Sequence, residues 1–270
     1  MTLILALRCQ DAVVMAADSQ ATESQGGNPA AGVRHDVEKI WQLGPNVLWG
    51  GSGSGGVIQD VKAALDEWAA TNAPRFAGQP RRLKGDLVGV VRPIVKAAYD
   101  GYVHIPGRPP SPPVTSFLFA GRTDDFRWIL EIDENGGGEL KTGDFAAIGS
   151  AYHFANVAAA MVSKYSASTH GYVHGQLLAL RILDTAVTAT AFGVGGALRL
   201  ALVGPDGTKV LDNAEVDQLR DQVDAWREAE AATLEELVLR KPDAAMVPES
   251  ATIAAPEPTT GSTSQGAADS

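Results

Sequence analysis

Thr2 and Asp18 are the earliest residues in the chain with side chains suited to catalysis. Once Met1 is removed, Thr2 would carry a hydroxyl nucleophile and a free α-amine, whose pKa of roughly 8 suits it to act as the base. Within residues 2–17 the pattern predicts two strands of similar length joined by a short turn. Antiparallel strands joined in this way bring their far ends together, so we expect Thr2 and Asp18 to be neighbours. On these residues alone, an ordinary opening strand is the commoner interpretation.

Lys39 begins a strand soon after the loop that follows Asp18, so an ion pair between the two side chains is sterically easy. An ammonium close to Thr2 would favour negative charge on the threonine oxygen and so ease formation of the alkoxide. Taken alone, a lysine at the start of a strand is usually just solvated.

A glycine-rich run, residues 51–56, leads into a predicted helix. Backbone N–H groups at such a turn can bind an anion, and glycine lets a substrate backbone approach closely. The run also satisfies the dinucleotide-binding pattern G-x-G-x-x-G. That pattern needs an acid about 20 residues later, whereas residues 70–74 read Ala-Thr-Asn-Ala-Pro. We therefore favour an oxyanion site over a nucleotide site.

Ser150 stands at a predicted strand-to-helix junction, where serine is an ordinary N-cap but could also relay a proton. His170 and His174 lack the acid of an H-E-x-x-H pattern and fall near a loop, so we expect no metal site. The sequence also contains no G-x-S-x-G motif of a serine hydrolase.

Composition restricts the classes of function. The formal net charge of −10, without a local basic patch, argues against a nucleic-acid or anionic-membrane surface. No apolar run approaches the ~20 residues of a membrane span, and the opening residues do not read as a secretion signal. The single cysteine, Cys9, rules out an internal disulfide and is expected to be a buried small hydrophobe. We expect a cytoplasmic protein.

The expected order of elements is strands, two helices, strands, two helices, strands. Residues 19–37 are polar and predict a loop, Pro93 predicts a kink or break in a helix over 83–99, and prolines between 106 and 113 predict an irregular connector. One strand is expected to end at Ile148. Helices in pairs and strands in hairpins favour two stacked sheets covered by helices over a doubly wound βαβ fold.

One more helix is expected over residues 214–237. Its apolar positions Val216, Leu219, Val223 and Trp226 step by three and four alternately. A strict heptad would next place Glu230 on the seam, so the stripe is expected to continue through Ala229, Thr233 and Leu237. This break in the heptad favours packing on its own domain over a seam against another subunit. Residues 241–270 are rich in Ala, Pro, Ser and Thr and predict a disordered tail. The expected organisation is a domain over 2–211, a helical extension over 212–240 and the tail.

The chain resembles the proteasome β-type family, including the bacterial HslV peptidases, within the N-terminal-nucleophile (Ntn) hydrolases. Three segments carry the resemblance: T-L-I-L-A-L-R-C-Q-D-A-V-V-M-A-A-D-S-Q-A-T, K-I-W-Q-L-G-P-N-V-L-W-G-G-S-G-S-G-G and A-A-I-G-S-A-Y. The resemblance covers roughly residues 2–211 and implies an α+β fold, the four-layer αββα sandwich, here with an extra C-terminal helix. It also implies no organic cofactor, self-assembly into stacked rings and an unfoldase that feeds the assembly.

The resemblance assigns roles to matching residues. Thr2 would be the nucleophile and would also supply the base. Asp18 and Lys39 would form the supporting ion pair. Gly53 would donate to the oxyanion, and Ser150 would assist proton transfer. The positions that would bind a peptide backbone as an added strand are Thr22, Gly51 and Gly55. The implied activity is that of a threonine endopeptidase, which hydrolyses peptides or unfolded proteins through an acyl-enzyme on Thr2.

Two alternatives remain open. Active members of the family carry an aspartate where this sequence has Ala191, which keeps open a catalytically silent structural subunit. An Ntn amidase that acts on a small molecule is the other alternative, and the peptide-binding positions count against it.

Overall fold

The structure is a computed structural model, and it describes residues 2–23, 33–73, 76, 78–107, 112, 114–123, 126–165, 167–190 and 194–239. The chain divides into a compact unit, Met1–Trp226, and a second unit, Arg227–Ser270. The predicted tail, residues 241–270, lies outside the described residues, as does much of the proline-rich connector. All residues discussed as a site belong to the compact unit.

Two antiparallel sheets form the centre of the compact unit. The first has the strand order β10-β1-β2-β11-β12 and consists of β1 (Ile4–Arg8), β2 (Val13–Asp18), β10 (Phe145–Ile148), β11 (Leu198–Gly204) and β12 (Gly207–Val210). The second has the order β5-β6-β7-β8-β9 and consists of β5 (Ile40–Gly44), β6 (Val47–Gly53), β7 (Thr115–Arg122), β8 (Arg127–Ile132) and β9 (Gly138–Leu140). A separate pair is formed by β3 (Gln20–Glu23) and β4 (Val33–Asp36).

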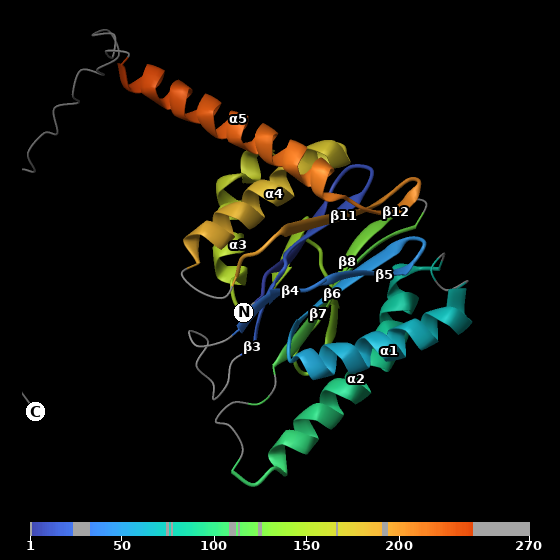
Figure 1. Cartoon of the computed structure of the whole chain (residues 1–270). Helices are drawn as coiled ribbons and strands as arrows, with labels where there is room; N and C mark the ends of the chain where they lie inside the picture. Colours follow the sequence, from blue (N-terminus) through green and yellow to red (C-terminus); the bar gives the residue numbers. More distant parts are fainter. Residues whose placement is uncertain are drawn as a thin grey trace, which may run out of the picture. The chain divides into compact units, whose positions relative to one another are not determined.

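Helices cover the outer face of each sheet. They are α1 (Gly55–Asn72), α2 (Pro80–Val103), α3 (Tyr152–Met161) and α4 (Tyr172–Ala189), with short 3₁₀ turns at Ser163–Tyr165 and Ala167–Thr169. A fifth helix, α5 (Asn213–Leu239), begins in the compact unit and continues into the second unit. In Figure 1, α3 and α4 lie on one side of the strands and α1 and α2 lie on the other. None of the described helices is both long and apolar enough to cross a membrane.

Three buried clusters explain why the layers hold together. Leu3, which precedes β1, and Leu5 and Leu7 of β1 belong to a cluster shared with α3, α4 and the start of α5. Ile4 and Ala6 belong to a second cluster between the two sheets, and a third cluster lies between the second sheet and helices α1 and α2. Because side chains alternate between the faces of a strand, an unbroken apolar run such as that of β1 serves two cores. The predicted four-layer α+β sandwich is confirmed.

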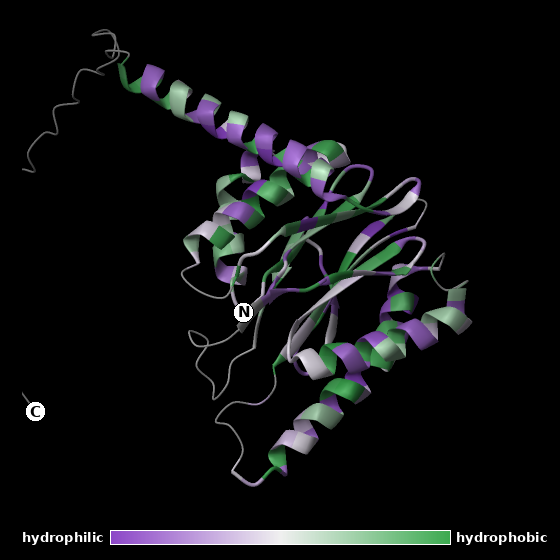
Figure 2. Cartoon of the chain, in the orientation of Figure 1, coloured by the Kyte–Doolittle hydropathy of each residue, from purple (hydrophilic) through white to green (hydrophobic). Residues whose placement is uncertain are grey.

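The helices show the amphipathic pattern that this arrangement requires. Figure 2 shows hydrophobic and hydrophilic residues alternating along α1 and α2, with hydrophobic residues along the central strands. On α5, the predicted stripe packs in the cluster with α3 and α4: Val216, Leu219 and Val223 are buried and Trp226 is partly buried. For these residues, packing on the helix's own domain is confirmed.

The polar stretch predicted as a loop over residues 19–37 contains β3 and β4, so that prediction is wrong at both ends of the stretch. The two strands pair with each other, with Gln20 opposite Asp36 and Ala21 opposite His35. Their hydrogen-bond partners are far apart in sequence, and the polar composition gave no strand signal.

The first half of the glycine run predicted as a turn belongs to a strand. β6 continues to Gly53, which is paired with Thr115 of β7. The ladder of hydrogen bonds from β7 outweighs the weak strand propensity of glycine. Only Ser54 separates the strand from α1.

The strand expected to end at Ile148 is β10, and its end is confirmed. The sequence did not predict the separate strand β9, which follows the turn after β8 and belongs to the second sheet. A kink or a break was expected at Pro93, and α2 continues through this residue, so there is no break in this described helix. Gly89 stands four residues before Pro93, both residues are exposed, and the carbonyl without a helical partner can therefore bind water.

Candidate active site

The inter-sheet core ends in polar residues on the first sheet. Ile4 of β1 and its register partner Ile148 of β10 both lie in that core. Because side chains alternate along a strand, Thr2 continues the face of Ile4 beyond the end of β1. The Thr2 backbone N–H donates to Ser150 Oγ at 3.2 Å. Thr2 and Ser150 therefore meet at one open end of the sandwich.

The second sheet ends in polar residues at the same place. Leu118 of β7 lies in the inter-sheet core, and Ser116 follows on the same face of that strand. Ser52 of β6 is the register partner of Ser116, and Glu131 of β8 is the partner of Leu118. Cross-strand partners share a face, so these hydroxyls and this carboxylate face the first sheet.

A cavity of about 610 Å³ occupies this end of the sandwich. Its walls come from both sheets and their connections and consist of Thr2, Ser52, Gly53, Val114, Ser116, Glu131, Glu134, Ala147, Ile148, Gly149, Ser150 and Tyr152. Three residues singled out in the sequence, Thr2, Gly53 and Ser150, are thus brought together although they are far apart in the chain.

Asp18 and Lys39 form a buried ion pair, with 2.8 Å between Lys39 Nζ and Asp18 Oδ1. The pair contacts the backbone beside Thr2, because the Leu3 N–H donates to the same Oδ1 at 2.8 Å. Lys39 Nζ also donates to the Gln20 carbonyl at 2.6 Å. The ends of the first hairpin therefore meet as predicted. The pair supports the Thr2 backbone from behind and is not part of the cavity wall.

Burial lowers the pKa of the Lys39 ammonium below its ordinary value, and the Asp18 carboxylate opposes this shift. The Gly195 N–H donates to the other Asp18 oxygen, Oδ2, at 3.2 Å. Two backbone donors and one ammonium thus share a carboxylate that is fully buried. Such a fully bonded carboxylate is held in one orientation.

Two glycines are needed for the walls of the cavity to come close together. Gly149 has φ +102, and a Cβ there would lie 2.1 Å from the Thr2 carbonyl oxygen. Gly53 has φ +126, and a Cβ there would lie 2.0 Å from the Val114 carbonyl oxygen. Positive φ favours glycine, and both approaches leave no room for a side chain. The next residue, Ser54, donates its N–H to Thr115 Oγ1 at 3.2 Å.

The positions predicted to bind a peptide backbone are more dispersed. Gly51 lies inside β6, where a Cβ would be 3.1 Å from Ile58 and 3.2 Å from Phe117, so it faces α1 and not the cavity. Gly55 is the exposed first residue of α1, with open space around it. Thr22 lies in β3, and its side chain is outside the described residues. Substrate binding by all three stays a prediction.

Sequence reasoning missed several residues of this site. Gly149 and Gly195 carried no assigned role, although each follows a recognisable strand or helix end. Glu131 could have been suspected because it is the one acid within the β8 sequence RWILEI. Ser52 and Ser116 gave no signal, because only the pairing of β6 with β7 brings them together. Among the described residues, no group of three or more His, Cys, Asp and Glu side chains could hold a metal ion.

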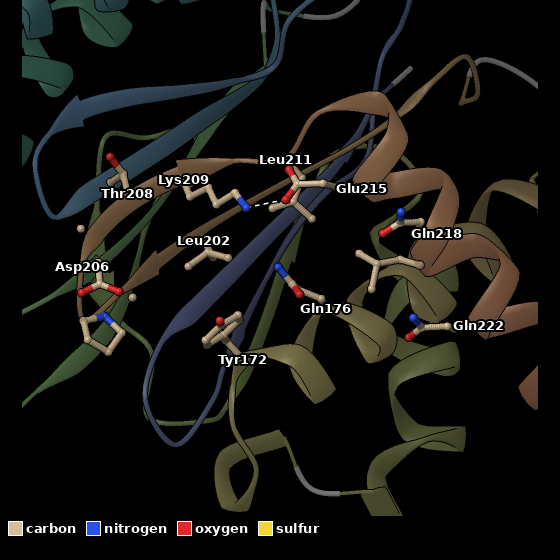
Figure 3. Close-up of a pocket in the computed structure, with 14 residues that line it drawn as sticks. Tyr172, Gln176, Leu202, Asp206, Thr208, Lys209, Leu211, Glu215, Gln218 and Gln222 are labelled. Carbon is tan, nitrogen blue, oxygen red and sulfur yellow. Dashed lines mark hydrogen bonds and ion pairs between the residues drawn. The ribbon is translucent and has the colours of Figure 1, made fainter.

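A second cavity, of about 330 Å³, lies beside α4, α5 and the β11–β12 hairpin. Figure 3 shows its polar lining, in which Lys209 and Glu215 form an ion pair and Gln176 points toward the interior. None of the residues predicted for catalysis or substrate binding lines it. The cavity that contains Thr2 is therefore the candidate active site.

The layers and the position of Thr2 define the class of fold, the four-layer sandwich of the Ntn hydrolases. Residues 2–80 match the sequence model of a family described as Proteasome subunit. Among solved structures, the Anbu (Gly-1) mutant from Hyphomicrobium sp. strain MC1 is similar, with a TM-score of 0.65, 17% sequence identity, and coverage of 87% of this chain and 97% of that one. No curated protein sequence matches the chain. The family match over residues 2–80 and the shared fold confirm the resemblance of this chain to the proteasome β-type family.

Proposed function

We propose that this chain is an N-terminal threonine peptidase that hydrolyses peptide bonds after removal of Met1. The observation that carries the proposal is the meeting of Thr2, Ser150 and Gly53 at one cavity. The buried Asp18–Lys39 pair behind Thr2 supports it, because nearby positive charge favours an alkoxide. An exposed surface threonine would have neither the cavity nor the pair.

In the proposed mechanism, Thr2 Oγ attacks the scissile carbonyl carbon while the free α-amine accepts the hydroxyl proton. A backbone N–H at Gly53 stabilises the oxyanion of the tetrahedral intermediate. The amine then passes its proton to the leaving amine, the C–N bond breaks, and an ester to Thr2 remains. Water attacks that ester by the same route and regenerates the hydroxyl. Ser150 Oγ, 3.2 Å from the Thr2 nitrogen, orients the amine through this proton transfer.

The proposal includes peptides or unfolded proteins as substrates. It also includes a homo-oligomer of stacked rings, an unfoldase partner and a cytoplasmic location. All of these parts rest on the resemblance to the family. The peptide substrate is further supported by Thr22 and Gly55, which match the positions where the family binds a peptide backbone.

A catalytically silent structural subunit is the second candidate. It is favoured by Ala191, which stands where active family members carry an aspartate. Ala191 lies outside the described residues. Loss of one supporting group usually slows a site more than it silences it, so we rank this candidate second.

The test is the intact mass of the protein after incubation with a β-lactone or an epoxyketone. The peptidase predicts one adduct on Thr2 of the wild type and of the control Thr71→Ala, and none on Thr2→Ala. N-terminal sequencing should begin at Thr2. Failure to label the wild type, under conditions that label a related peptidase, would favour the silent subunit.

A further inference from the structure

The cavity that contains Thr2 is acidic. Two of its lining residues, Glu131 and Glu134, carry carboxylates, and no lysine, arginine or histidine is among them. We propose that this cavity selects peptides with a lysine or arginine side chain beside the scissile bond. The inference rests on the proposed peptidase function and names the class of substrate that its active site prefers.

The negative charge of Glu131 is only partly compensated by its ion-pair partner. Its carboxylate lies 2.8 Å from Lys141 Nζ, and the same ammonium lies 2.6 Å from Glu139. One positive charge therefore serves two carboxylates, and Glu139 does not line the cavity. The Glu131 side chain remains 26% exposed, so a substrate cation can reach it.

Glu134 has no ion-pair partner among the described residues and is exposed at the turn after β8. The turn itself is well held. Asp133 Oδ1 accepts N–H groups from Asn135 at 2.9 Å and from Gly137 at 2.7 Å, and Arg92 Nε donates to the Gly136 carbonyl at 2.9 Å. Glu134 is thus an unneutralised carboxylate on a fixed turn at the cavity wall.

The rest of the wall suits a long cationic side chain. Val114 and Tyr152 are partly exposed there and offer apolar surface to a methylene stem. Lysine and arginine pack such a stem on apolar surface while the charged end contacts carboxylates. Two carboxylates supply far fewer than the roughly 6–8 oxygen ligands of a calcium site, so a substrate cation is the better match.

The test compares internally quenched peptides that differ only by lysine or glutamine at each position next to the scissile bond. For the wild type we expect kcat/KM to favour lysine at one of these positions. Removal of one carboxylate, in Glu134→Gln or Glu131→Gln, should reduce the preference about fivefold, the effect of one opposite charge ~4 Å away in water. Added salt should reduce it as well. The control Glu67→Gln makes the same charge change on the exposed face of α1, outside the cavity, and should leave the preference unchanged.

The outcomes separate this inference from the proposed function. Equal cleavage of both peptides, or a preference that survives both variants, refutes the inference and leaves the peptidase intact. If the wild type cleaves neither peptide, the binding of the same peptides to Thr2→Ala, measured by fluorescence anisotropy, tests the inference. Tighter binding of the lysine peptide to Thr2→Ala, with no such preference in Thr2→Ala/Glu134→Gln, supports a cation-selective cavity without catalysis. Equal binding refutes it.

Discussion

Replacing Lys39 by alanine tests the buried ion pair on which the proposed chemistry depends. The Lys39 side chain is 5% exposed and that of Asp18 is 0% exposed. The substitution removes the ammonium from Asp18 Oδ1 and from the Gln20 carbonyl. The Asp18 carboxylate then keeps only the N–H groups of Leu3 and Gly195 as hydrogen-bond donors. A buried charge is left without its counter-charge.

The expected loss of stability is large. Removing one partner of a buried ion pair lowers the free energy of unfolding by about 3–5 kcal/mol. For a unit of this size, each kcal/mol corresponds to about 2–4 °C, so Tm should fall by roughly 6–20 °C. Removing both charges in Asp18→Asn/Lys39→Met should cost less than the sum of the single substitutions, because no charge is then left unpaired.

Urea denaturation followed by tryptophan fluorescence measures this loss, since Trp49 and Trp128 are buried. The matched control is Lys209→Ala, which breaks an exposed ion pair whose two side chains are 57% and 36% exposed. Exposed pairs contribute about 0–1 kcal/mol, so the control should unfold nearly as the wild type does.

Activity is then measured at a temperature where Lys39→Ala remains folded. We expect turnover to be lost, because the positive charge near Thr2 is gone. The reasoning fails if Lys39→Ala is as stable as Lys209→Ala, or if the folded variant turns over peptide at a near-normal rate.

Two other substitutions test local features of the compact unit. Gly53→Ala should lower the free energy of unfolding by more than about 1–3 kcal/mol, because it adds a clash with the Val114 carbonyl to the strain of a positive φ. In the control Gly55→Ala the added methyl group meets open space, so the free energy of unfolding should change by less than about 1 kcal/mol. Equal urea midpoints for the two variants would contradict this prediction. Burial, with a smaller contribution from Asp11, raises the pKa of the Cys9 thiol to about 12, so iodoacetamide should alkylate Cys9 slowly in the native protein and rapidly in urea. The linked stability is fully present below the ordinary thiol pKa and is lost as pH rises from there toward about 12, and a stability curve in this range that is the same for the wild type and Cys9→Ala would contradict it.

Contacts between residues close in the chain could be predicted from the sequence. The first hairpin brings its ends together as expected, and the N–H of Leu3, the residue after Thr2, donates to Asp18. The Asp18–Lys39 pair was also foreseen, because one loop separates the two residues. The order of helix pairs and hairpins was enough to predict four layers. The predicted roles of these residues await the experiments above.

Contacts between strands far apart in the chain could not be predicted from the sequence. Nothing local distinguishes β9 from β10, yet β9 pairs with β8 in one sheet and β10 with β1 in the other. The strands β3 and β4 form from polar residues because each supplies the hydrogen bonds of the other.

Residue chemistry along the chain thus identifies the nucleophile candidate, its ion pair and the glycine-rich run of residues 51–56, since these depend on side-chain type and short separations. The cavity itself depends on which strands become neighbours. Ser52, Ser116 and Glu131 come from three strands, and only sheet register aligns them on one face opposite Thr2. Register is settled by burial of the shared inter-sheet core, a property of the folded chain that no short segment carries.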